Sequence, residues 1–158
     1  VEEASMDEWH RLVAVNLTGV VLGTRVALPH LKARGATSAH GSAIVNLASV
    51  AGLVGSQLDP LYSLTKGGVT LFTKSTALEF GRKGYRIRVN SIHPGVIDTD
   101  MQVQLRGADP AGFPDRDAFV QMKAGGRLDS PAVAAARVLA YLRRGDFGQQ
   151  PVADVRDA

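Results

Sequence analysis

Short apolar segments alternate with long amphipathic stretches along this chain of 158 residues, and this alternation is what most constrains its fold. Residues 42–48 and 86–92 are each typical of a strand, because they are short, mostly apolar and bounded by turn residues. A helix from about Leu61 to Phe80 separates them, and Pro94 must end the second, since proline cannot continue a central ladder. The pattern predicts a parallel α/β sheet in which strands 43–48 and 87–92 lie side by side.

A long helical stripe precedes the first strand. Its members recur every three or four positions and form one helix face: Trp9, Leu12, Val13, Leu17, Val20, Thr24, Ala27, Leu28 and Leu31. Ser5 and Glu8 form a capping box that predicts where this helix begins, and Pro29 followed by Gly35 predicts where it ends. Asn16 interrupts the stripe. Because a buried amide needs hydrogen-bond partners, Asn16 is either a structural link or part of a site.

The carboxyl-terminal part of the sequence is less regular. Ser130 and Pro131 mark the start of a last helix, and residues 151–155 are expected to form a short closing strand. Residues 100–127 show only a weak pattern, with two prolines among charges, which indicates a mobile, partly helical insertion. The length fits one domain over residues 1–158, although three strands are few for a sheet that usually has about five or six.

Composition excludes several classes of protein. The chain has no cysteine, which removes disulfides, a thiolate nucleophile and a cysteine-based zinc site. Its 18 basic and 15 acidic residues give a net charge of +3 and are scattered, which is not typical of a nucleic-acid-binding surface. No run approaches eighteen consecutive apolar residues, and the acidic start is unlike a signal peptide. We therefore expect a cytoplasmic protein with neither a nucleic acid nor a membrane as partner.

Polar residues follow both strands at the edge where such sheets gather functional groups. Ser49 ends the first strand, and Tyr62 and Lys66 share one face of the next helix because they are four residues apart. We expect these three side chains to converge on one cleft, with Gly52 and Gly55 loosening the segment between them.

Each of these residues has a simpler interpretation. An isolated Tyr–Lys pair is as well explained by two solvated side chains, and Ser49 by a turn at a strand end. His93 has no partner at metal-ligand spacing, so no metal site is expected. A Ser–His–Asp hydrolase does not fit, because the sequence has no Gly-x-Ser-x-Gly elbow.

Four ordered stretches together resemble the short-chain dehydrogenase/reductase family: Asn16–Gly19, Ile44–Gly52, Tyr62–Gly68 and the segment that begins at Pro94-Gly95. The resemblance implies a Rossmann-like, doubly wound parallel sheet, here partial because its amino-terminal strands are absent. The family's Gly-rich turn and Asn-Asn-Ala-Gly element do not occur in these residues. We therefore expect the catalytic and substrate-binding part of a longer enzyme, inactive as an isolated chain.

The same resemblance implies hydride transfer between NAD or NADP and a secondary alcohol or ketone, as in hydroxysteroid and secondary-alcohol dehydrogenases. Tyr62 would be the general acid/base, with Lys66 lowering its pKa. Ser49 would hold the substrate oxygen, and Asn16 would anchor a water that passes protons onward from Lys66. The cofactor would contact Tyr62, Lys66, Pro94, Gly95, Ile97 and Thr99.

The resemblance also implies a homodimer or homotetramer built on the helices of residues 9–31 and 61–80. Both helices carry more apolar residues than one sheet face can cover, among them Val21, Val26, Leu71 and Phe72. The alternative is a catalytically inactive, truncated member of the family that acts as a subunit-interface module.

Overall fold

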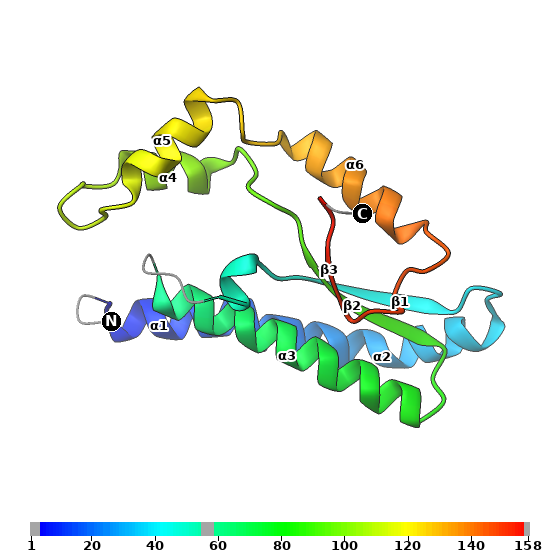
Figure 1. The fold of residues 1–158 in the computed structure, drawn as a ribbon. Coiled ribbons are helices and arrows are strands. Elements are labelled where there is room, and N and C mark those ends of the chain that lie inside the picture. Colours follow the sequence, from blue (N-terminus) through cyan, green and yellow to red (C-terminus); the bar gives the residue numbers. More distant parts are fainter. Residues whose placement is uncertain (1–3, 55–58, 157–158) are drawn as a thin grey trace. The chain divides into compact units, whose positions relative to one another are not determined.

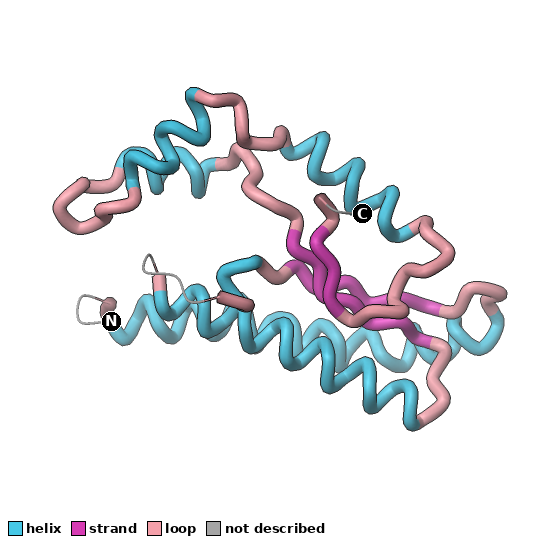
Figure 2. Tube along the Cα trace, viewed as in Figure 1, coloured by secondary structure: helices cyan, strands magenta, loops and turns pink. Residues whose placement is uncertain are grey.

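The computed structural model describes residues 4–54 and 59–156 of the chain (Figures 1 and 2). In chain order the elements are α1 (Met6–Val13), the π-helical turn η1 (Ala14–Thr18), α2 (Gly19–Thr37), β1 (Ser42–Leu47), the 3₁₀ turn η2 (Val50–Gly52), α3 (Pro60–Arg82), β2 (Ile87–His93), α4 (Asp100–Gly107), α5 (Arg116–Ala124), α6 (Pro131–Leu142) and β3 (Val152–Asp154). The chain divides into two compact units, residues 1–93 with 145–153 and residues 94–144 with 154–158. A single domain over residues 1–158 stays a prediction.

The first unit is built on an open sheet with strand order β1-β2-β3. β1 and β2 are parallel, with Ser42 opposite Ile87 and Leu47 opposite Ile92, which confirms that the two predicted strands are adjacent and parallel. β2 is buried along nearly its whole length. We expected the same of β1, but Ala43 and Leu47 are exposed, because β1 is the outer strand of the described sheet.

The helical stripe is confirmed, since each of its residues is half-buried while most of their helical neighbours are exposed. Ser5 and Glu8 form the predicted capping box. The predicted end is wrong, because the helix continues through Pro29 and Gly35 to Thr37. Pro29 lies on the exposed side of α2. Gly35 is buried, and a Cβ there would lie 2.8 Å from the Arg86 carbonyl oxygen, so this glycine serves close packing rather than helix termination.

α3 begins and ends with recognisable caps. Pro60 takes the first helical position, and the Asp59 carboxylate accepts from the Tyr62 amide at 2.9 Å. At the other end the Tyr85 amide donates to Phe80 and the Gly84 amide to Gly81, which is a Schellman motif. The cap places Phe80 against the sheet.

The core of the first unit lies between the helices and the sheet. Phe80 of α3 forms a buried cluster with Ile87 and Val89 of β2, and Leu28 and Leu31 of α2 pack against it. α2 and α3 therefore cover the same face of the sheet, as Figure 1 shows. Apolar burial on this face is the main stabilisation of the unit.

The continuous helix Met6–Thr37 is long and apolar enough to cross a membrane by length and composition, with a mean hydropathy of 1.6 over 18 residues. A count of consecutive apolar residues missed this property, because a window mean tolerates interspersed polar residues such as Asn16. Core helices of soluble proteins and signal sequences pass the same test, so it is weak evidence for a span. The absence of a membrane partner stays a prediction.

The second unit holds α4, α5 and α6. Residues 100–127 are partly helical, as expected, and their mobility stays a prediction. Ser130 caps α6 by accepting from the Val133 amide at 3.3 Å, as its sequence predicted.

Two glycines of α2 give a matched test of the close packing at its end. Gly35→Ala should destabilise the chain by about 1–3 kcal/mol, because the new methyl group meets the fixed carbonyl of Arg86. Gly23→Ala meets nothing within 4 Å and should be neutral or stabilising by up to about 1 kcal/mol. The free energy of unfolding, measured by urea denaturation, distinguishes the two. Equal effects of both substitutions would contradict the packing described.

Candidate active site

After the carboxyl end of β1 the chain makes a sharp turn, η2, that packs against α3. Ser49 is extended (φ −161°, ψ 153°) and caps the turn η2 by accepting from the Ala51 amide at 3.2 Å. The turn then contacts α3 directly, since a Cβ on Gly52 would lie 2.5 Å from the Lys66 carbonyl carbon. Gly55 lies outside the described residues. Gly52 does not loosen the segment as expected, but allows it to press against the helix backbone.

This contact brings Ser49 to Tyr62, and the Ser49 hydroxyl lies close enough to the phenol to lower its pKa. The two residues belong to different elements, so their approach depends on how η2 and α3 pack. The Asp59 carboxylate fixes the first turn of α3 by accepting from the Tyr62 amide. Ser49 therefore caps a turn and also lies near Tyr62, while its catalytic role stays a prediction.

Lys66 lies one turn further along α3. Its Nζ donates to the carbonyl of Leu47, the last residue of β1, at 2.9 Å, and lies 5.6 Å from the centre of the Tyr62 ring. Burial lowers the pKa of Lys66. An ammonium has three N–H groups, and in the described part of the chain only one of them is hydrogen-bonded. Ser49, Tyr62 and Lys66 thus converge at the carboxyl end of β1.

The pKa of Tyr62 is raised from its ordinary value, chiefly by burial. The hydrogen bond from Ser49 opposes this rise, and the Asp59 carboxylate adds to it. The resemblance implied that Lys66 lowers this pKa; Lys66 is not among the causes of the shift, and that role stays a prediction. Its ammonium is held at the Leu47 carbonyl over the ring rather than at the phenol oxygen. Tyr62 therefore keeps its proton at neutral pH.

Asn16 reaches the same helix through a residue that the sequence analysis missed. Its Nδ2 donates to Thr65 Oγ1 at 3.0 Å, and the Thr65 hydroxyl donates to the Tyr62 carbonyl at 2.9 Å. Thr65 is fully buried. Asn16 lies in η1, the wide turn between α1 and α2, so this chain of bonds joins that turn to the first turn of α3. A threonine on the buried face of α3 beside Lys66 was the available signal.

The other predicted cofactor residues belong to the second unit. Pro94 and Gly95, with a φ of +87° at Gly95, follow β2 directly, and Ile97 pairs with Asp129 in a parallel bridge. Thr99 takes the N-cap position of α4, but its side chain caps no amide and makes only a long contact, 3.4 Å, to the Ile97 carbonyl. Its exposed hydroxyl remains available to a ligand.

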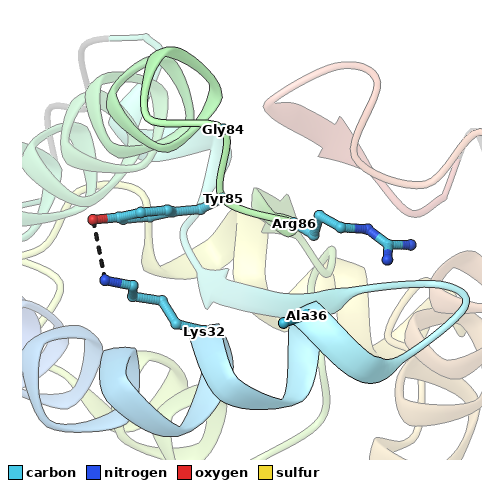
Figure 3. A pocket seen from close by; sticks show the side chains of 5 residues that line it. All are labelled: Lys32, Ala36, Gly84, Tyr85 and Arg86. Atoms are coloured by element: carbon cyan, nitrogen blue, oxygen red, sulfur yellow. Dashed lines mark hydrogen bonds between the residues drawn. The ribbon is translucent and has the colours of Figure 1, made fainter.

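A pocket of about 260 Å³ lies elsewhere in the first unit. Figure 3 shows its lining, which is Lys32, Ala36, Gly84, Tyr85 and Arg86. The Lys32 ammonium donates to the Tyr85 hydroxyl at 3.3 Å, while the Arg86 side chain points away from both. The pocket adjoins the amino end of β2, whereas Ser49 follows the carboxyl end of β1, so it holds none of the predicted site residues.

Comparisons with known proteins agree on one family. Residues 1–109 match the family model of the short chain dehydrogenases. The chain is 39% identical over 109 residues to the NADP-dependent (R)-specific alcohol dehydrogenase of Lentilactobacillus kefiri, covering 69% of this chain and 42% of that protein. It is 38% identical over 157 residues to the cyclohexanol dehydrogenase of an Acinetobacter species (strain SE19), covering 97% and 56%.

The fold comparison gives the same result. The crystal structure of levodione reductase superposes with a TM-score of 0.73 at 32% identity, covering 97% of this chain and 58% of that one. The α/β fold with a partial, Rossmann-like parallel sheet is therefore confirmed. The chain spans about half the length of the curated relatives it matches.

Two substitutions beside Tyr62 should move its pKa in opposite directions. Ser49→Ala removes the bond that lowers this pKa and should raise it further. Asp59→Asn keeps a helix cap but removes the negative charge, and should lower it. Ultraviolet titration of the phenols measures both shifts, with Tyr62→Phe as the reference that isolates Tyr62 from the other tyrosines. If the pKa of Tyr62 moved in the same direction in both variants, the effects assigned to Ser49 and Asp59 would be wrong.

Proposed function

Since the chain belongs to the short-chain dehydrogenase family, we propose that it is the catalytic and substrate-binding part of an NAD(P)-dependent oxidoreductase that interconverts a secondary alcohol and a ketone. The observation that carries this proposal is the convergence of Ser49, Tyr62 and Lys66 at the carboxyl end of β1, with the Lys66 ammonium over the Tyr62 ring. The names of the similar alcohol dehydrogenases support the substrate class.

Tyr62 is the proton donor and acceptor in this proposal. Because its pKa is raised, the phenol is protonated at neutral pH and can give its proton to a carbonyl oxygen as the carbonyl carbon takes up a hydride. Ser49 holds that oxygen while negative charge develops on it. In the reverse direction a cation close to the phenol would be needed to lower its pKa.

Lys66 and Asn16 assist Tyr62 in this chemistry. With two N–H groups unused in the described residues, Lys66 can bind hydroxyl groups of a ligand beside Tyr62 and lend its positive charge to the phenolate. Asn16, through Thr65, holds the turn that carries Tyr62, and in this proposal it also anchors a water that passes protons on from Lys66.

A nicotinamide dinucleotide, NAD or NADP, would supply or accept the hydride when bound. Taken unit by unit, the donors fit such a group: in the first unit Lys66 has N–H groups that make no bond among the described residues and match its hydroxyl groups, and in the second unit the uncapped hydroxyl of Thr99 matches its amide. We assign Tyr62, Lys66, Pro94, Gly95, Ile97 and Thr99 to its nicotinamide end. A Gly-x-Gly-x-x-Gly pattern, which marks the usual pyrophosphate-binding turn between a strand and a helix, does not occur in the 158-residue sequence.

Exposed apolar side chains on α2 and α3 support a homodimer or homotetramer. Val26 is 71% exposed and Leu71 66%, while Phe72 is half-buried. Patches of this kind usually mark contact surfaces. The same observation favours the second candidate function, a catalytically inactive subunit-interface module, which keeps the surface but needs no Tyr62 chemistry.

A chimaera decides between the two functions. Residues 1–158 are joined to the amino-terminal part of a short-chain dehydrogenase that carries the Gly-rich turn, and NADH or NADPH oxidation is followed with a cyclic ketone. The chimaera should reduce the ketone, and Tyr62→Phe should lower kcat by about 10²- to 10⁴-fold without changing the fold, because the proton donor is lost.

Two references accompany this assay. Tyr85→Phe, in the pocket at the amino end of β2, should leave kcat unchanged. The 158 residues alone should show no saturable binding of NADH or NADPH at micromolar concentration, since several charge-assisted hydrogen bonds to the pyrophosphate, each about 1.5–3 kcal/mol, are missing. A chimaera that is equally active with and without the Tyr62 hydroxyl would contradict the proposed function.

A further inference from the structure

The segment after β2 is held in the second unit by backbone pairing. The Asp98 amide donates to the Asp129 carbonyl at 2.9 Å, and the Asp129 amide donates to the Val96 carbonyl at 3.1 Å. Ile97 and Asp129 thereby form a parallel bridge. This pairing fixes the backbone of residues 96–98 and therefore the position of the Asp98 Cα, from which the side chain extends.

The Asp98 carboxylate contacts both helices of the insertion. One oxygen accepts a hydrogen bond from the Lys123 ammonium of α5. The other lies 3.7 Å from a guanidinium nitrogen of Arg106, near the end of α4. The Asp98 side chain is 31% exposed and that of Arg106 only 17%, so the pair with Arg106 is partly shielded from water. One carboxylate thus joins two helices to one segment.

In the described part of the second unit, few other contacts hold α4 and α5 to the segment Val96–Thr99. Gln102 is the only buried residue of α4, and α5 has none. The other prominent contacts join the two helices, or their loop, to each other. These are the Arg116 Nε bond to the Arg106 carbonyl at 2.9 Å and the ring contact of Phe113 with Phe119 at 5.7 Å. Apolar burial is small, so ion pairs have an unusually large share in holding the helices.

We propose that Asp98 is an electrostatic link, called the clasp below, that holds α4 and α5 to the segment Val96–Thr99. The clasp sets the free energy of local unfolding of residues 100–124. Asp98 is a positioning residue, since it acts through Arg106 and Lys123. If the proposed function holds, Ile97 and Thr99 flank the nicotinamide end of the site, and the clasp then couples the order of the insertion to that end. The clasp itself requires no bound ligand.

Hydrogen exchange of the unliganded chain, read by mass spectrometry peptide by peptide, tests the clasp. Asp98→Asn should speed exchange in peptides of α4 and α5 about three- to tenfold and leave α2 and α3 unchanged, since two ion pairs are lost. Wild-type exchange in the same peptides should rise between about 0.05 M and about 1 M salt, and Asp98→Asn should abolish that dependence. Lys123→Gln should give a smaller increase, absent on the Asp98→Asn background.

Asp117→Asn is the matched control. Asp117 is also paired, with its neighbour Arg116, but its side chain is 77% exposed and it joins nothing to the segment Val96–Thr99. Its loss should leave the exchange unchanged. Equal exchange in Asp98→Asn and wild type would overturn the clasp, and so would an increase that extends to α2 and α3, which would mark a general loss of stability. Because the readout uses no cofactor or substrate, failure of the clasp leaves the proposed dehydrogenase function standing, and the reverse also holds.

Discussion

Contact between two backbones, that of Gly52 and that of Lys66–Gly67, is the constraint on which the candidate site depends. With no side chain between them, the turn after β1 lies directly on α3. Ser49 then reaches Tyr62, and Lys66 reaches the Leu47 carbonyl. The end of a strand and the start of a helix are thus joined at several points, and the three side chains of the proposed chemistry lie where they meet.

Buried threonines extend this arrangement along α3. Thr65 accepts from Asn16 of η1, and Thr73 accepts from Asn46 of β1 at 2.8 Å. Both hydroxyls also donate to carbonyls of their own helix. Because a buried amide left without a partner is costly, these bonds fix the rotation of α3 more tightly than apolar packing alone. The orientation of Tyr62 toward Ser49 follows from that rotation.

The sequence predicted what depends on local patterns and missed what depends on a neighbouring element. Periodicity and capping residues located the helical stripe, the box at Ser5 and the parallel strands, because each pattern is contained within its own segment. Gly35 and Gly52 were misinterpreted as a helix end and a flexible joint. Their actual role, admitting the backbone of another element, is visible only once Arg86 and Lys66 are placed beside them. Thr65 was missed for the same reason.

The most direct test of this account is a titration of Tyr62 in Gly52→Ala, Ser49→Ala and the double variant. If the Gly52 contact is what brings Ser49 to Tyr62, the added methyl group separates them. Gly52→Ala should then raise the pKa of Tyr62 as Ser49→Ala does, and the double variant should add nothing. An unchanged pKa in Gly52→Ala, or fully additive shifts in the double variant, would contradict the central role of that contact.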